Sequence, residues 1–361
     1  MNINRVTNVL KKMGAMDLKQ LLITDPMSIN YLTGYYTFPH ERFLGLLLRA
    51  DGNHVLFLNK LFFLTQDPGV ELSWHSDTDP VMDMVAEYLL PGETLGVDKL
   101  MAAKFLVPLM DNEKTGKIVL GSICVDEARG AKDAEEIEKM REASRINDLA
   151  MDRLKKLIRP GVTEIEIADQ LLDIYKELGA DGHSFDPIVA FGPNGADGHH
   201  SPDNTVLKEG DSIIFDVGCI KNGYCSDMTR TFFAGVPSER DRQVYETCLK
   251  AHKEAIAMIK PGIPLSSIDG TARGIITAAG YGKEFNHRLG HFIGQEVHEF
   301  GDVSSKNERL TEPGMIFSIE PGIYLRDEMG VRIENLVVVT EDGVEELNHY
   351  TREFEDMCVD F

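Results

Sequence analysis

The sequence predicts an α/β protein of two domains, in which the second domain consists of two similar halves. The chain has 361 residues, a length that suits two domains at roughly 100–200 residues each. Strand-like and helix-like stretches alternate over the first ~125 residues, and the rest of the chain contains an internal repeat. We therefore expect domains at residues 1–125 and 133–361, joined by a linker at residues 126–132.

The first domain is expected to contain a mostly buried sheet. Strand-sized apolar runs occur at residues 21–24, 43–48 and 54–58, and residues 79–90 have the apolar spacing of a helix. Such alternation is typical of an α/β unit. No group of His, Asp and Glu in this domain has the spacing of a ligand set, so we expect the chemistry to lie in the second domain.

The second domain is expected to begin with a long helix. Asp133, followed three residues later by Glu136, forms a capping-box pattern. Apolar residues then recur at helical spacing as far as about residue 158. This helix would open the first of the two halves.

Three blocks of the second domain recur in the same order. Residues 159–162 (RPGV) recur as residues 260–263 (KPGI), 101 positions further on. The strand-like segment 210–218 parallels 314–322, and the glycine-containing segment 223–227 parallels 330–334. The repeat predicts two halves, each a helix followed by a hairpin, related by a pseudo-twofold axis.

The repeat aligns Asp216 with Glu320 and Asp227 with Glu334. In each half the first acid ends an apolar strand, and the second follows a glycine turn, so strand pairing would bring all four acids to the domain centre. Four carboxylates require compensating cations there, and oxygen ligands suit Mn²⁺, Co²⁺, Zn²⁺ or Fe²⁺. The alternative is that each acid caps a turn beside glycine, which explains less well why the acids match in both halves.

Histidines form two short clusters in the same domain. His287, His291 and His298 fall within twelve residues, and His199 and His200 follow a glycine-rich segment. The first half has no histidine at the place of His291, which suggests that one half has specialised. A lone histidine is more often structural, but two clusters beside four aligned acids favour a functional site.

Composition and missing motifs exclude several classes of protein. The net charge of −22, from 37 basic and 59 acidic residues, argues against nucleic acid as a partner. No apolar run approaches the ~18 residues of a spanning helix, and no secretory signal is recognisable, so we expect a soluble cytoplasmic protein without a membrane partner. The five cysteines form no C-x-x-C pair, which argues against disulfides and zinc-thiolate sites. Neither H-E-x-x-H, G-x-S-x-G nor a phosphate-binding loop is present.

Five strings of the second domain carry a family resemblance: FDVG, NGYCSDMTRTF, HRLGHFIGQEVHE, SIEPGIY and VRIEN. Together they resemble the pita-bread metallopeptidases, the family of methionine aminopeptidase, Xaa-Pro aminopeptidase and Xaa-Pro dipeptidase (prolidase). The resemblance implies a two-metal site, with manganese as the expected ion. Its implied ligands are Asp216, Asp227, His291, Glu320 and Glu334. Because all five are present, the metal-free members of the family are a poorer match.

The resemblance also implies roles for residues around the metals. His199 and His298 would bind substrate and stabilise the transition state, Glu320 would take a proton from the attacking water, and His287 and Arg332 would surround them. Phe292 replaces a glycine that is common in the family and is expected to narrow the pocket beside His291. The role of His200 is left open.

The first ~125 residues resemble the creatinase-like extra domain of the proline-specific branch of the family. Within them, residues 39–42 (PHER) resemble a loop of prolidases from lactic-acid bacteria that reaches the active site of the partner subunit, which implies a homodimer. Those prolidases tend to have Asp before the proline, whereas this chain has Phe38.

The expected reaction is hydrolysis of the Xaa-Pro bond of a dipeptide by a water or hydroxide shared by two divalent ions. Arginine or histidine would bind the terminal carboxylate, and the candidates are Arg288, Arg309 and, from a neighbouring subunit, His40 or Arg42. A surface ion pair is the alternative role for each. Two other functions remain open: an Xaa-Pro aminopeptidase and a non-catalytic peptide- or protein-binding module.

Overall fold

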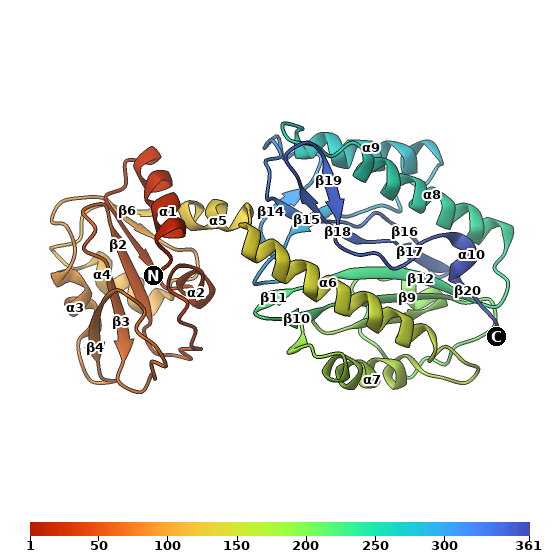
Figure 1. Ribbon diagram of the computed structural model, residues 1–361, viewed down its shortest axis with the longest axis horizontal. Coiled ribbons are helices and arrows are strands. Elements are labelled where there is room, and N and C mark those ends of the chain that lie inside the picture. The colour runs from red at the N-terminus through yellow and green to blue at the C-terminus, as the bar shows by residue number, and fades with distance from the viewer. The chain divides into compact units, whose positions relative to one another are not determined.

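The computed structural model describes residues 1–361 and divides into two compact units, Met1–Arg129 and Gly130–Phe361. Figure 1 labels the elements of each unit. The division falls inside the segment expected to be a linker, and part of that segment belongs to helix α5. None of the helices has the length and apolar composition that a transmembrane helix requires.

The amino-terminal unit is a six-stranded sheet in the order β4-β3-β2-β1-β5-β6. The β1–β2 and β2–β3 pairs are antiparallel and the other three pairs are parallel. Its elements are α1 (Ile3–Ala15), β1 (Gln20–Ile23), α2 (Pro26–Thr33), β2 (Gly45–Arg49), β3 (Val55–Asn59), β4 (Glu71–His75), α3 (Val81–Glu87), β5 (Leu95–Val97), α4 (Ala103–Met110), β6 (Ile118–Leu120) and α5 (Ile123–Gly130).

Alternating side chains of the buried strands create a core on each face of this sheet. Leu21 and Ile23 of β1 pack with residues of α1, α2 and α5, whereas Leu22 packs with residues of α3 and α4. The unit therefore has three layers, helix, sheet and helix. The three expected strands are confirmed as β1, β2 and β3. The expected helix at 79–90 is the shorter α3, which follows Pro80.

The second unit contains the two halves that the repeat predicted. The elements of the first half are α6 (Ala134–Lys155), α7 (Glu164–Glu177), β7 (Gly182–His183), β8 (Ile188–Phe191), the 3₁₀ helix η1 (Gly192–Ala196), β9 (Ser212–Val217), β10 (Cys219–Lys221), β11 (Tyr224–Cys225) and β12 (Met228–Ala234). Those of the second half are α8 (Glu239–Ala257), α9 (Leu265–Ala278), β13 (Gly290–Phe292), β14 (Glu299–Val303), β15 (Ile316–Ile319), β16 (Gly322–Leu325), β17 (Met329–Arg332), β18 (Asn335–Val339), β19 (Val344–Glu346), α10 (Phe354–Met357) and β20 (Cys358–Val359).

Each half packs a pair of helices against its own sheet. In Figure 1, α6 and α7 lie on one side of the strands and α8 and α9 on the other. The two larger sheets run β20-β12-β9-β8 and β14-β13-β15-β18-β19, and β20 from the end of the chain joins the sheet of the first half. The smaller sheets are β11-β10-β7 and β16-β17. The long helix expected from residue 133 is α6, and its capping box is confirmed. The side chain of Asp133 accepts a hydrogen bond from the backbone N–H of Glu136, and the side chain of Glu136 accepts one from the backbone N–H of Asp133.

The repeated Pro-Gly turns have the same backbone conformation in both halves. Gly161 has φ +80° before α7, and Gly262 has φ +82° before α9. A side chain is strained in this left-handed region, so glycine suits both positions. The repeat seen in the sequence is therefore a repeat of structure.

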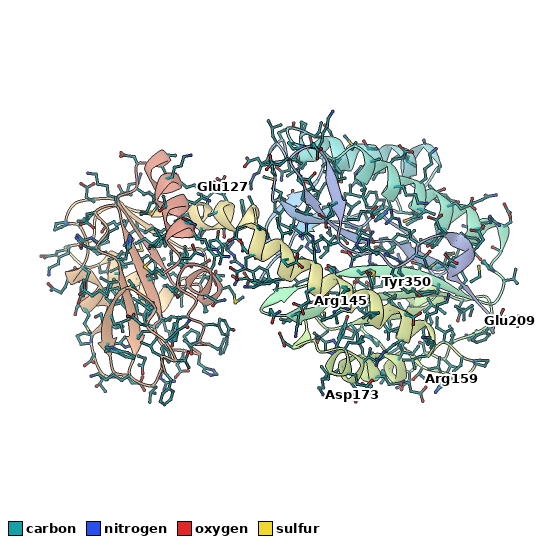
Figure 2. All side chains as sticks on the ribbon, in the orientation of Figure 1. Glu127, Arg145, Arg159, Asp173, Glu209 and Tyr350 are labelled. Carbon is teal, nitrogen blue, oxygen red and sulfur yellow. The ribbon has the colours of Figure 1, made fainter.

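Most charged side chains lie on the outside of the molecule, and Figure 2 labels several, including Arg145, Asp173 and Glu209. The five cysteines are free thiols, four of them buried. Several large apolar side chains are exposed, among them Phe38 and Phe63 of the amino-terminal unit.

Candidate active site

The second unit contains an open cavity of about 490 Å³ that is lined by residues from both of its halves. All five implied metal ligands line it: Asp216, Asp227, His291, Glu320 and Glu334. The structure thus brings together residues that are up to 118 positions apart in the chain.

The strand ends explain how the four acids meet. Asp216 is near the end of β9, and Asp227 directly precedes β12, which pairs with β9 in antiparallel register. In the other half Glu320 directly follows β15 and Glu334 directly precedes its partner strand β18. Each hairpin therefore delivers two carboxylates to one end of its sheet, as the repeat predicted.

The ligand atoms lie within the span of a metal site. One atom each of Asp227, His291 and Glu334 lies within 4.8 Å of the others. Nε2 of His291 is 3.6 Å from Oδ2 of Asp227 and 3.5 Å from Oε1 of Glu320. Both distances are longer than a usual hydrogen bond, so space remains between the atoms that could bind a metal.

Burial makes these carboxylates costly to ionise. It raises the pKa of Glu320 to about 7 and holds the pKa values of Asp227 and Glu334 well above their ordinary range. The neighbouring charges of Asp216 on Asp227, and of Asp227 on Glu334, add to this effect. The Oδ1 atoms of Asp216 and Asp227 are buried without a hydrogen-bond partner. Such a set of hard oxygen donors with one imidazole fits divalent cations.

A buried arginine compensates part of the negative charge. Nη2 of Arg332 donates to Oδ2 of Asp216 at 2.6 Å, and Nη1 donates to the hydroxyl oxygen of Tyr324 at 2.8 Å. Thr229 lies opposite Asp216 in the β9–β12 pairing, and its hydroxyl donates to Oε2 of Glu334 at 2.7 Å. These contacts fix the carboxylates of both halves with respect to one another.

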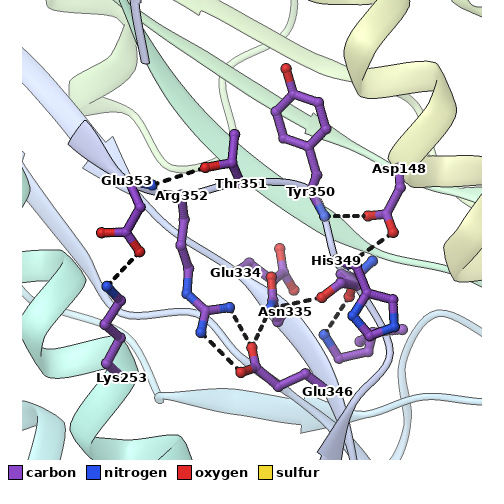
Figure 3. Close-up of polar contacts among 12 residues, drawn as sticks. Asp148, Lys253, Glu334, Asn335, Glu346, His349, Tyr350, Thr351, Arg352 and Glu353 are labelled. Carbon is purple, nitrogen blue, oxygen red and sulfur yellow. Dashed lines mark hydrogen bonds and ion pairs between the residues drawn. The ribbon is translucent and has the colours of Figure 1, made fainter. Parts of the chain in front are cut away.

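The chain after Glu334 is tied down by a second polar network, shown in Figure 3. Asp148 of α6 accepts hydrogen bonds from the backbone N–H groups of His349 and Tyr350. Glu346 accepts from the side chains of Arg352 and Asn335. The carboxyl-terminal segment therefore supports the strand that begins beside Glu334.

Besides His291, three of the predicted histidines line the same cavity as the acids. The ring of His298 lies edge-on to that of His291, with 4.2 Å between centroids. Burial, followed by the charge of His291, lowers the pKa of His298 to about 4. Burial and then the charge of Arg332 lower the pKa of His287 to about 4. His199 is exposed at the cavity wall, so the cavity presents imidazoles on several sides of the carboxylates.

Comparison with known proteins places this geometry in a family. Residues 138–341 match metallopeptidase family M24, and residues 5–130 match the creatinase/prolidase N-terminal domain. The chain belongs to metallopeptidase family M24. Its enzyme class, its creatinase-like first domain and its pita-bread second domain are thereby confirmed.

Relatives of this M24 peptidase match it over nearly its whole length. An uncharacterized peptidase of Staphylococcus aureus (strain USA300) is 36% identical over 357 residues, which are 97% of this chain and 100% of that protein. The crystal structure of dipeptidase PepE from Mycobacterium ulcerans is 32% identical, with a TM-score of 0.93 over 99% of this chain and 98% of that one. A prolidase structure from Thermococcus sibiricus is 34% identical, with a TM-score of 0.90 over 98% and 99%.

The arginines proposed for carboxylate binding lie in different surroundings. Arg288 lines the cavity of the M24 peptidase and pairs with no carboxylate. Arg309 does not line it, and its guanidinium lies 5.8 Å from the ring centroid of Phe292. Arg42 and His40 belong to the amino-terminal unit, where Arg42 pairs with Asp77. Within one chain, only Arg288 of these candidates belongs to the cavity.

The expectation that Phe292 narrows the pocket is wrong. Its side chain is fully buried and packs on Phe317, with 5.5 Å between ring centroids, and it does not line the cavity. The pairing of β13 with β14 shifts register between His291 and Phe292. At this irregularity His291 lines the cavity and Phe292 packs into the core.

Sequence reasoning missed several residues that the structure brings to the site. Tyr324 is buried between Arg332 and His287, to which it is joined by hydrogen bonds. Phe185 and Ile188 form an apolar part of the cavity wall. Thr229 could have been found from the sequence. It lies two residues after Asp227, and residues two apart along a strand point to the same face.

Proposed function

We propose that this M24 peptidase hydrolyses the Xaa-Pro bond of dipeptides, using two divalent ions held by Asp216, Asp227, His291, Glu320 and Glu334. The observation that carries the proposal is the convergence of four carboxylates and one imidazole on one cavity, with two carboxylate oxygens buried and unpartnered. The similarity to a prolidase and to dipeptidase PepE supports a dipeptide substrate.

The donor set of the site suits a hard divalent cation, and manganese is our proposal for the native ion. When bound, such ions supply a Lewis acid and allow a water to ionise near neutral pH. Their charge would also offset the cost of burying Asp227 and Glu334 in ionised form.

The residues of the chain supply the proton transfers. Glu320 is proposed to take a proton from the attacking water. The Ser318 hydroxyl donates to Oε1 of Glu320 at 3.1 Å, which leaves Oε2 to hold that proton. The neutral ring of His298, together with His199, would donate N–H to the oxyanion that develops on the substrate carbonyl.

Arg288 is our proposal for the group that binds the terminal carboxylate of a dipeptide. It lines the cavity without an acidic partner, and a guanidinium can bind a carboxylate through two parallel hydrogen bonds. Replacing Arg288 with Ala should raise KM for an Xaa-Pro dipeptide by about tenfold to a hundredfold. The matched control is the Xaa-Pro amide, whose KM should not change. An equal effect on the dipeptide and its amide would contradict this role.

The choice of substrate is tested by comparing kcat/KM on Xaa-Pro with kcat/KM on Xaa-Pro-Yaa, using the Mn²⁺-loaded protein. The proposal predicts that the dipeptide is the better substrate. A clear preference for the longer peptide would instead identify an Xaa-Pro aminopeptidase. Absence of any metal-dependent hydrolysis on either substrate would leave only a binding function.

Two further parts of the proposal concern the state of the protein in the cell. We propose a homodimer, in which His40 and Arg42 of a second copy would complete the site, and a cytoplasmic location. Sedimentation analysis of the purified protein tests the first part. A monomer with full dipeptidase activity would contradict the contribution of the second copy.

A further inference from the structure

Glu164 is a fully buried acid outside the carboxylate cluster, and all the hydrogen-bond partners of its carboxylate lie in residues 191–203. It is the first residue of α7. Its Oε1 accepts from the backbone N–H of Phe191 at 2.7 Å and from the side-chain amide of Asn194 at 3.0 Å. Its Oε2 is 2.7 Å from Nε2 of His200 and accepts from the backbone N–H of Asp203 at 3.0 Å.

The segment that Glu164 holds, residues 191–203, runs from the last residue of β8 into the connection between β8 and β9. This connection carries His199, the residue directly before His200, into the wall of the cavity. On the other side of His199, the Gly198 carbonyl accepts from Nη1 of Arg332 at 3.4 Å. His199 therefore lies between two residues that are held in place. Gly198 is held by Arg332, which lines the cavity, and His200 is held by Glu164, which does not.

A metal ion is a poor alternative explanation of this cluster. Atoms of Glu164, His200 and Asp203 do lie within 4.8 Å of one another. However, each carboxylate oxygen of Glu164 already faces two nitrogen donors. A cation would have to displace these N–H groups to reach the oxygen lone pairs, whereas four hydrogen bonds satisfy a buried carboxylate without one.

We propose that Glu164 is a positioning residue that sets the place of the His199 imidazole in the active-site cavity through His200 and the backbone of residues 191–203. This inference rests on the proposed function for its kinetic consequence. The sequence left the role of His200 open. In this proposal His200 connects Glu164 to the neighbouring residue His199. A shift of a catalytic group by about 1 Å can cost roughly a hundredfold in rate.

A double-mutant cycle tests the proposal in the Mn²⁺-loaded full chain. Glu164→Gln keeps the shape of the side chain but places an amide N–H where two N–H donors now point. We expect it to lower kcat on an Xaa-Pro dipeptide by about tenfold to a hundredfold, with little change in KM. In the His199→Ala background the same substitution should lower kcat by less than about threefold, because its effect passes through His199.

Variants of neighbouring residues separate positioning from a general loss of stability. His200→Gln can still donate an N–H toward Glu164 and should retain most of the activity, whereas His200→Ala should behave like Glu164→Gln. The matched control is Glu166→Ala, on the same turn of α7, which removes an exposed capping hydrogen bond to the backbone N–H of Thr163. It should leave kcat unchanged.

A second measurement does not depend on peptidase activity. In metal-free protein labelled with ¹³C at histidine Cε1, the signal of His199 is assigned by its loss in His199→Ala. Glu164→Gln should shift or broaden that signal while the signals of His287 and His298 stay in place. Equal kinetic losses in both backgrounds, or an unchanged His199 signal, would overturn the proposal. If the wild-type protein hydrolysed no Xaa-Pro substrate, the proposed function would fail, and the spectra would still decide the positioning role.

Discussion

Nη2 of Arg332 lies 2.6 Å from Oδ2 of Asp216, and both side chains are largely buried, with exposed fractions of 4% and 13%. Arg332 also reaches Tyr324 and the Gly198 carbonyl. One guanidinium thus connects an acid of the first half with a hairpin of the second half and with the segment that carries His199.

The first prediction concerns this ion pair. Arg332→Met should lower the free energy of unfolding of the metal-free protein by about 3–5 kcal/mol, because it leaves the Asp216 carboxylate buried without its cation. Adding Mn²⁺ should recover part of the loss. Urea unfolding followed by circular dichroism measures both effects. Arg326→Met, which alters an exposed arginine of the same unit, is the control and should change nothing measurable. Equal stability of the two variants would contradict the account.

The second prediction concerns the ring of His298. Because burial lowers its pKa to about 4, the imidazole is neutral at pH 7 and can donate one N–H. His298→Ala should therefore lower kcat on an Xaa-Pro dipeptide by roughly 10²–10³, with a smaller change in KM. His298→Gln, which keeps a side-chain N–H, should recover part of the rate. The role would be wrong if His298→Ala changed KM alone.

The third prediction concerns pH and the buried His252 of α8. Both ring nitrogens of His252 are buried. Burial and then the cationic Arg352, Arg230 and Lys253 hold its pKa well below 6.5. Below pH 6.5 the unfolded chain binds a proton at this residue and the folded chain does not. The free energy of unfolding should therefore fall as the pH falls, by up to about 1.4 kcal/mol per pH unit from this group.

His252→Leu, which cannot bind a proton, should remove that part of the slope between pH 6.5 and 5.5. Circular dichroism is the suitable probe, because the single tryptophan, Trp74, lies in β4 of the amino-terminal unit and reports on that unit. An identical pH dependence in the wild-type protein and in His252→Leu would show that His252 is protonated in the folded state as readily as in the unfolded one.

The sequence was sufficient to predict the residues that the strand ends bring together. Asp216 and Glu320 end apolar strands, and Asp227 and Glu334 precede the partner strands, so an internal repeat and antiparallel pairing were enough to place them at one point. The same reasoning applied to α6, where the Asp133 capping box marks the helix start within the sequence itself.

Other features depend on contacts that no local pattern contains. Glu164 looks in the sequence like an ordinary acid in the first turn of a helix, where the helix dipole favours it, and only the folded chain brings its donors from residues 191–203. Phe292 was misjudged because only the folded chain shows that its ring packs on Phe317 in the core and not against the cavity. Helix α1 was missed although Val6, Val9 and Met13 have helical spacing and are buried.

The central claim is that the carboxylate cluster holds divalent ions, and that Glu320 takes the proton from the water that attacks an Xaa-Pro bond. The most direct test is to strip the protein of metal, reload it with Mn²⁺, and measure bound metal and Xaa-Pro hydrolysis together in the wild-type protein, Glu320→Ala and the exposed control Glu312→Ala. The account predicts about two ions per chain and metal-dependent hydrolysis in the wild-type protein and the control, and less than about 1% of that turnover in Glu320→Ala. Hydrolysis that persists without metal, or full activity in Glu320→Ala, would contradict it.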